Sequence, residues 1–248
     1  FFYRPPGATS GAWHVMSDTA PLRRGGCEWP ADPQAQLDSG CCKGWSHYAS
    51  MDLAHWVNVG CAVANTSWFD AVGLDTGSAT LVDGTPAIMY PGVHPNRTGE
   101  RPNYNCVDKS RHCTANALII ATPTNLSDVW LRHWTKQPVP AIQCHGGHCP
   151  MNESGYIDDP SHAWRDPDTR QFYATFGSGM TETQEGAGTQ ALLCSSPDFW
   201  SNWTCDDLLW KFGSSSSAAA GFEPDGGAIF GHPGGNAIAC PDFWQLPP

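Results

Sequence analysis

Positive charge is scarce in this chain of 248 residues, which carries 13 Lys and Arg against 24 Asp and Glu, for a formal net charge of −11. A phosphate-backbone partner requires a basic face, so this composition argues against nucleic-acid binding. Long apolar runs are also missing, which excludes a membrane-spanning helix, and no charged segment followed by an apolar one marks a leader peptide. The composition favours a small neutral or cationic partner.

Uninterrupted helical periodicity is absent as well, because 26 glycines and 21 prolines break every long segment. We therefore expect an all-β fold with few and short helices. Strands are predicted at residues 78–82, 85–90, 117–121, 171–176 and 189–194. The first two flank Asp83-Gly84, a pair suited to the positive φ angles of a type I′ hairpin. The low-complexity stretch 214–221 is expected to be a flexible loop, with a linker between domains as the alternative.

A turn motif recurs three times along the chain, each time with Ser, then Asp, an apolar residue and finally Trp. The copies are Ser50–Trp56, Ser127–Trp134 and Ser196–Trp203. Their spacing of about 70 to 80 residues fits one β-propeller blade with long loops. Chance recurrence of common turn residues is the alternative. We expect the three repeated tryptophans to be structural.

Eleven cysteines and five Asn-x-Ser/Thr sequons indicate the secretory pathway. The sequons begin at Asn65, Asn96, Asn125, Asn152 and Asn202. Cys106–Cys113, Cys144–Cys149 and Cys194–Cys205 are plausible local disulfides, and Cys27, Cys41, Cys42 and Cys61 can supply two more, leaving Cys240 unpaired. The stretch Cys144-His145-Gly146-Gly147-His148-Cys149 contains the ligand types of structural zinc. Adjacent side chains diverge, however, so a disulfide loop is preferred and neither a metal nor a cofactor is expected.

Four short motifs stand in order between residues 45 and 242. They are Trp45-Ser46-His47, Thr76-Gly77-Ser78-Ala79-Thr80, Trp164-Arg165-Asp166-Pro167 and Ala239-Cys240-Pro241-Asp242. In this order they resemble the active-site motifs of glycoside hydrolase family 32, the invertases and fructan hydrolases. The five-bladed arabinanase and xylosidase propellers are a neighbouring class, but the Ser-Ala-Thr and Cys-Pro-Asp-Phe signatures favour the fructosidase side.

The resemblance implies a five-bladed β-propeller with a central sugar pocket, followed in full-length members by a β-sandwich. We expect residues 1–248 to form one partial propeller domain, truncated at both ends. It would lack the first strands, the last blade and the β-sandwich. The nucleophile of the family, in an Asn-Asp-Pro-Asn-Gly motif, would precede Phe1.

The resemblance also assigns the site residues. Asp166 would stabilise the cationic transition state, and Arg165 would keep that carboxylate ionised and bind the sugar. An isolated Arg-Asp-Pro can instead be a strand-edge turn. Ser78 and the rings of Trp13, Trp45 and Trp164 would contact or wall the pocket.

The general-acid position of the family is occupied by Ala239, which cannot donate a proton. Loss of a positioned general acid costs about two to four powers of ten in rate. Glu223, sixteen residues earlier, is a conceivable substitute acid, although a surface-loop carboxylate is the preferred interpretation.

The functional hypothesis is a secreted, cell-wall or vacuolar protein that hydrolyses β-fructofuranosides, sucrose or fructans, with retention of configuration. The alternative is a catalytically inactive homologue that retains a carbohydrate-binding pocket. A third possibility is a mispredicted splice junction within residues 213–239. The expected partner is a small sugar or an oligosaccharide, without nucleic acid and without a membrane span.

Overall fold

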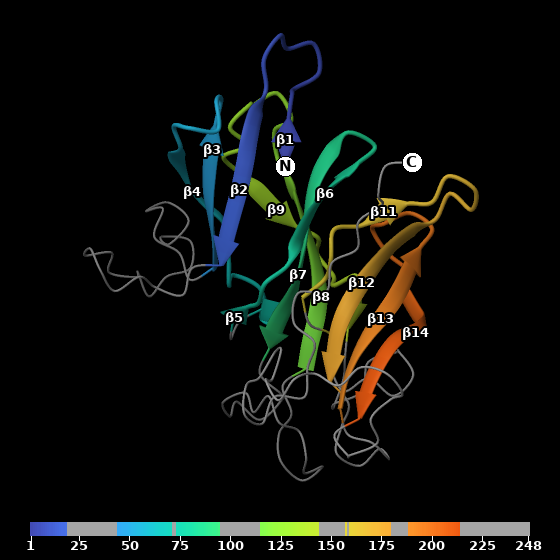
Figure 1. The fold of residues 1–248 in the computed structure, drawn as a ribbon. Coiled ribbons are helices and arrows are strands. Elements are labelled where there is room, and N and C mark those ends of the chain that lie inside the picture. The colour runs from blue at the N-terminus through green and yellow to red at the C-terminus, as the bar shows by residue number, and fades with distance from the viewer. Residues whose placement is uncertain are drawn as a thin grey trace, which may run out of the picture.

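Three antiparallel β-sheets make up the computed structural model, which describes residues 1–18, 44–70, 73–94, 115–143, 157, 159–179 and 188–213 (Figure 1). The first sheet has the order β1 (Phe2–Tyr3), β2 (Ala12–Asp18), β3 (Gly44–Ser50) and β4 (Val57–Ala64). Within the described ranges, the 3-10 turn η1 (Trp68–Asp70) is the single helical element. The all-β class expected from the sequence is confirmed.

The second and third sheets repeat the same up-and-down order. The second contains β6 (Ser78–Val82), β7 (Thr85–His94), β8 (Ala115–Pro123) and β9 (Trp134–Lys136), with β5 (Gly73–Leu74) beside β7 and β10 (Ile142–Gln143) beside β8. The third contains β11 (Trp164–Arg165), β12 (Phe172–Gly179), β13 (Gly188–Ser196) and β14 (Thr204–Gly213). Four of the five predicted strand segments lie within these elements, and the fifth, 171–176, lies in β12 except for its first residue.

The hairpin between β6 and β7 has the predicted turn chemistry. Val82 pairs with Thr85, which leaves Asp83 and Gly84 as the two loop residues. Their φ angles are 48° and 84°, so both central residues are left-handed, as a type I′ turn requires. The twist of this turn matches that of the strands, which explains why a two-residue connection suffices.

The central strand β8 of the middle sheet is buried on both faces because this sheet packs between the other two. Residues Ala117–Ala121 of β8 are all 0% exposed. Ile119 belongs to the core shared with the first sheet, together with Trp45, whereas Ile120 belongs to the core shared with the third, together with Phe176. Successive strand residues point to opposite faces, so a strand between two cores must be apolar throughout.

The repeated Ser-Asp-Trp motif forms the connection between the third and fourth strands of each sheet. Every copy contains a residue with positive φ whose carbonyl oxygen accepts a hydrogen bond from the indole N–H of the repeated tryptophan. The pairs are Trp56 with Leu53 at 3.1 Å, Trp134 with Leu131 at 2.8 Å and Trp203 with Phe199 at 2.7 Å. The repeat is therefore structural and marks one sheet per copy.

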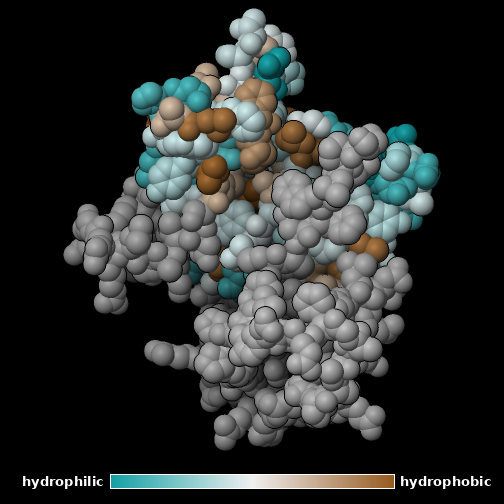
Figure 2. All heavy atoms as spheres, in the orientation of Figure 1, coloured by the Kyte–Doolittle hydropathy of each residue, from teal (hydrophilic) through white to brown (hydrophobic). Residues whose placement is uncertain are grey.

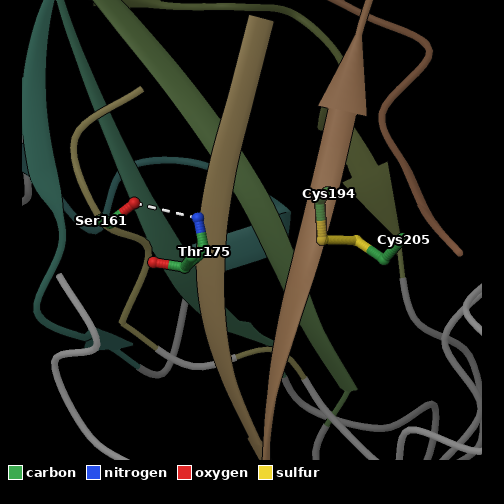
Figure 3. The surroundings of a disulfide bond; sticks show 4 residues. All are labelled: Ser161, Thr175, Cys194 and Cys205. Carbon is green, nitrogen blue, oxygen red and sulfur yellow. Dashed lines mark hydrogen bonds between the residues drawn. A yellow bond between two sulfur atoms is a disulfide. The ribbon is translucent and has the colours of Figure 1, made fainter. Parts of the chain in front are cut away.

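A disulfide joins Cys194 on β13 to Cys205 on β14, one of the local pairings that the sequence suggested (Figure 3). Both residues are buried in the core between the second and third sheets. Cys61 also takes part in a disulfide. The other cysteines of the expected pairs, and the stretch 214–221, lie outside the described residues.

In the part of the chain that the structure describes, no helix has the length and apolarity needed to cross a bilayer.

Candidate functional site

Three side-chain contacts hold β6 against the segment 161–165, which leads into β11. The Ser78 hydroxyl donates to a carbonyl, the Thr80 hydroxyl accepts from a backbone N–H, and an Arg165 nitrogen donates to a carboxylate. The contacts join Ser78 to Ser161 at 2.6 Å, Thr80 to Ala163 at 2.8 Å and Asp83 to Arg165 at 3.1 Å. Residue numbers rise together on both sides, so the two segments run in the same direction. Two of the four motifs are thus side by side.

Asp166 occupies the tight turn between β11 and β12, at a partly exposed position. Its Oδ1 accepts hydrogen bonds from the backbone N–H groups of Asp168 at 2.9 Å and Thr169 at 2.7 Å, and from the Thr169 hydroxyl at 3.0 Å. The Thr169 N–H and hydroxyl lower the pKa of Asp166 from its ordinary value. One carboxylate oxygen therefore stabilises the hairpin turn, as short acidic side chains commonly do.

Arg165 does not pair with Asp166. Its Nε donates to the carbonyl of Arg170 at 3.0 Å, its other contact is the Asp83 carboxylate, and the guanidinium lies 5.1 Å from the Phe172 ring centroid. The prediction that Arg165 keeps Asp166 ionised was therefore wrong. Adjacent residues of an extended strand point to opposite sides, which directs the two side chains apart.

The predicted sugar-contacting residues divide between two ends of β6. Ser78 begins this strand, whereas Arg165 contacts Asp83, one residue beyond its other end, and Asp166 follows. At about 3.3 Å per residue, a five-residue strand spans roughly 15 Å. Ser78 and the segment Arg165-Asp166 therefore lie near opposite ends of β6.

The three tryptophans expected around the pocket also lie apart. Trp45 is 5% exposed, packs against Tyr90 and donates its indole N–H to the carbonyl of Asp75 at 3.3 Å. It is a core residue, which corrects its expected place in an open wall. Trp164 is half-buried and stacks on Tyr173 with ring centroids 6.0 Å apart.

Trp13 belongs to a different surface, at the upper end of the first sheet. It is 38% exposed and packs against Phe2 with ring centroids 5.0 Å apart. Apolar residues gather in this region, where Figure 2 shows brown spheres over the ends of β2 and β3. The exposed members are Trp13, Val15, Met51, Leu53, Trp56 and Val57. A sugar-stacking role for Trp13 or Trp164 stays a prediction.

Gly77 explains why the motif before Ser78 contains a glycine. A Cβ at this position would lie 2.1 Å from the Met89 carbonyl oxygen and 2.8 Å from the Tyr90 Cα. Both are backbone atoms of β7 that cannot move independently of the sheet. The close approach sets the start of β6, and with it the position of the Ser78 hydroxyl.

The histidine of the first motif is buried rather than presented to a ligand. His47 and His14 are each 1% exposed, and their Nε2 and Nδ1 atoms lie 2.9 Å apart. Burial is the largest cause that lowers the pKa of His14 to about 4 and that of His47 to about 3. Both rings are therefore neutral at physiological pH and form part of the contact between strands β2 and β3.

Sequence reasoning missed Asp159, a buried carboxylate that precedes β11. Asp159 is 8% exposed, has a φ of 22° and is followed by Pro160. Ser161 is held to β12, because its hydroxyl accepts from the Thr175 N–H at 2.9 Å and its N–H donates to the Thr175 carbonyl at 2.8 Å (Figure 3). The available signal was another Asp-Pro dipeptide, seven residues before Asp166-Pro167.

Ala239 and Glu223 lie outside the described residues, so their roles stay predictions. Among the side chains that can be placed, none form a group of three or more His, Cys, Asp or Glu arranged to hold a metal ion.

Comparison with known proteins identifies the family. The model of the glycosyl hydrolases family 32 N-terminal domain matches residues 33–246. The chain belongs to glycoside hydrolase family 32. This family 32 chain is 30% identical to a fructan 1-exohydrolase of Aegilops tauschii over 206 residues, which are 82% of this chain and 27% of that protein. It is 29% identical to an insoluble β-fructofuranosidase isoenzyme of Arabidopsis thaliana over 203 residues, 82% of this chain and 28% of the relative.

A solved structure supports the fold of this family 32 chain. Fructan 1-exohydrolase IIa of Cichorium intybus, in complex with 1-kestose, superposes with a TM-score of 0.59 at 24% identity, covering 94% of this chain and 32% of that one. At this identity the likeness concerns the all-β arrangement of curled sheets. The chain spans about a quarter to a third of the length of the relatives it matches.

Proposed function

We propose that the full-length protein acts on β-fructofuranosides, such as sucrose or fructans. The observation that carries this proposal is the family match over residues 33–246, which includes all four ordered motifs. The relatives are named as a β-fructofuranosidase and fructan 1-exohydrolases. The three sheets would be consecutive blades of a five-bladed propeller, and the remaining blades would come from residues outside the described ranges.

Retention of configuration would require a nucleophilic carboxylate and a general acid about 5 Å apart. This chain contributes Ala239 at the acid position, and a methyl group cannot protonate a leaving oxygen. The observation favours a second candidate function, in which the protein binds β-fructofuranosides without turning them over. Both candidates use the same sugar pocket and differ only in the chemical step.

We further propose that the protein enters the secretory pathway. Asn125 and Asn202 begin sequons in the turns before β9 and β14, and both are exposed, as a glycosylated asparagine must be. The disulfide between Cys194 and Cys205 suits an oxidising compartment. Relatives named as insoluble and acid β-fructofuranosidases support a cell-wall or vacuolar location.

The test compares the full-length protein with its Ala239→Glu variant, measuring fructose release from sucrose and 1-kestose alongside binding of the same sugars by calorimetry. Release by the variant alone supports a binding protein that has lost its acid. Release by both supports an enzyme with another proton donor, which Glu223→Gln would then abolish. If neither protein binds or cleaves either sugar, the proposed function is wrong.

A further inference from the structure

We propose that Ser78 and Thr80 are positioning residues, whose hydroxyl groups align the Trp-Arg-Asp-Pro motif (164–167) with β6 and do not contact the sugar. The inference rests on the proposed function, because it concerns the pocket of the same fructoside-binding protein. It follows from the spacing of two side-chain contacts, from the hydrogen that Ser78 has available, and from the support of the segment 161–163 on its other side.

The two contacts have the same spacing along the chain. Ser78 donates to the carbonyl of Ser161 at 2.6 Å. Thr80 accepts from the N–H of Ala163 at 2.8 Å, and the residues of each pair are 83 positions apart. Residues two apart on a strand point to the same face, so both hydroxyls lie on one face of β6. The segment 161–163 therefore follows that face in a fixed register, and a slip of one residue would break both contacts.

The single hydroxyl hydrogen of Ser78 is used within the protein. At 2.6 Å from the Ser161 oxygen, this hydrogen forms a short hydrogen bond to a carbonyl whose residue is 4% exposed. Donation to a sugar hydroxyl would withdraw the hydrogen from that buried carbonyl, which costs free energy. Thr80 likewise accepts from Ala163, which is 6% exposed. These contacts account for both hydroxyls without a sugar ligand.

The segment 161–163 is also held by the third sheet. The N–H of Ser161 donates to the Thr175 carbonyl at 2.8 Å, and the Ser161 hydroxyl accepts from the Thr175 N–H at 2.9 Å (Figure 3). Thr175 belongs to β12, so the segment is fixed between β6 of the second sheet and β12 of the third. A backbone held from two sides is the support that a preorganised binding site requires.

The fixed segment leads directly into the Trp-Arg-Asp-Pro motif. Trp164 follows Ala163 and begins β11, and Arg165 contacts Asp83 just past the end of β6 at 3.1 Å. Gly77 fixes the other end of β6, because a Cβ there would overlap backbone atoms of β7. The strand thus sets the level of the motif. A misplacement of about 1 Å at a site can cost about two powers of ten in rate, so loss of either hydroxyl should affect the sugar.

The test measures binding of 1-kestose and sucrose by calorimetry in full-length Ser78→Ala, Thr80→Val and Thr80→Ser, with thermal unfolding to check each fold. Ser78→Ala and Thr80→Val are expected to weaken binding by about five-fold or more. Thr80→Ser keeps the hydroxyl and should bind within about two-fold of the wild type. Hydrogen exchange of the Ala163 amide should be faster in Thr80→Val and unchanged in Thr80→Ser, because the hydroxyl is its acceptor.

Ser196→Ala is the matched control. The Ser196 hydroxyl is buried and also donates to a backbone carbonyl, that of Ser201, at 2.6 Å. This bond lies in the connection between β13 and β14 and involves no residue of the four motifs. Its removal should lower Tm at least as much as Ser78→Ala does, yet leave sugar binding within about two-fold of the wild type.

Normal binding by folded Ser78→Ala and Thr80→Val, with the wild type binding both sugars, overturns the positioning role and leaves the proposed function intact. A loss in Ser78→Ala alone also overturns it, because Ser78 would then contact the sugar itself. An equal loss in Ser196→Ala overturns it as well, since binding would simply follow stability. A wild type that binds neither sugar overturns both proposals. Should Thr80→Val fail to fold, Thr80→Ala is measured in its place, with the same expected loss.

Discussion

Replacing Lys136 by methionine should destabilise the junction between the first and second sheets. The Lys136 ammonium donates to the Asp70 carboxylate, to the carbonyl of Ala64 at the end of β4, and to the Thr66 hydroxyl at 3.1 Å. Asp70 is 0% exposed and also accepts from the Tyr90 hydroxyl at 3.4 Å. Burial raises the pKa of Asp70 and lowers that of Lys136, and each charge opposes the shift of the other.

The magnitude follows from what the substitution leaves behind. Methionine preserves most of the aliphatic volume of Lys136 but removes the charge that compensates Asp70, whose side chain is shielded from water. Breaking a buried ion pair by removing one partner costs about 3–5 kcal/mol. For a domain of this size, each kcal/mol lowers Tm by about 2–4 °C, so the expected decrease is about 6–20 °C. Adding Asp70→Asn should recover part of the loss, because the double variant no longer buries a lone charge.

The assay is urea denaturation of the full-length protein followed by tryptophan fluorescence, with thermal unfolding in parallel. Arg132→Met is the control: its ion pair with Asp128 is made at 2.8 Å, but the Arg132 side chain is 52% exposed. Exposed pairs contribute about 0–1 kcal/mol, so this variant should stay near the wild type. If Lys136→Met costs no more than Arg132→Met, the buried pair does not hold the two sheets together and the reasoning fails.

Three further changes test other contacts by the same denaturation assay. Gly77→Ala should lower the free energy of unfolding by more than about 2 kcal/mol, because the added Cβ would overlap backbone atoms of β7. Gly73→Ala is the control, because a Cβ there meets open space and should change the free energy of unfolding by less than about 1 kcal/mol. Equal effects of the two substitutions would contradict the role of the close approach at Gly77. Unfolding free energy should fall as pH drops from 6.5 to 4, because His14 and His47 stay neutral when folded, with pKa values of about 4 and about 3, whereas the unfolded chain binds more protons. A lowering of the pKa of one histidine by this much corresponds to about 3 kcal/mol of pH-dependent stability. Replacement of both histidines by Phe should remove this pH dependence, and an unchanged pH slope in that variant would refute the interpretation that both rings are buried and neutral. Trp203→Phe should cost about 1–3 kcal/mol, because it leaves a buried carbonyl without its donor, and wild-type stability would count against that contact.

The fold was predictable wherever local chemistry determined it. Asp83-Gly84 specified its hairpin because few residue pairs accept two positive φ angles, and the apolar run Ala117–Ala121 specified a strand buried on both faces. The recurring Ser-Asp-Trp turn gave the period of the sheets because it is held by hydrogen bonds within a few residues of sequence. In each case the signal lies within the segment itself, as two positive φ angles, an unbroken apolar run or hydrogen bonds over a few residues.

Contacts between distant segments were not predictable in the same way. Arg165 pairs with Asp83, 82 residues earlier in the chain, and His47 meets His14 across 33 residues. Nothing in the sequence around Arg165 indicates which carboxylate it contacts, so the neighbouring Asp166 was the natural choice. The packing of the segment 161–165 against β6 decides the matter, and that packing depends on how two sheets meet.

Two Asp-Pro dipeptides, Asp159-Pro160 and Asp166-Pro167, show how the same difficulty affects the candidate site. Their residue types are equal, and Asp166 has the preceding arginine that the family motif contains, so comparison of letters selects Asp166. The structure shows that the two dipeptides have different surroundings, because Asp159 is buried and Asp166 lies partly exposed in the turn between β11 and β12. This difference depends on how the segment 161–165 packs against β6, and the hydrogen bond from Ser78 to Ser161 makes that contact across 83 residues. A contact of such long range leaves no signal in the residues next to either dipeptide, so comparison of short motifs alone does not reveal it.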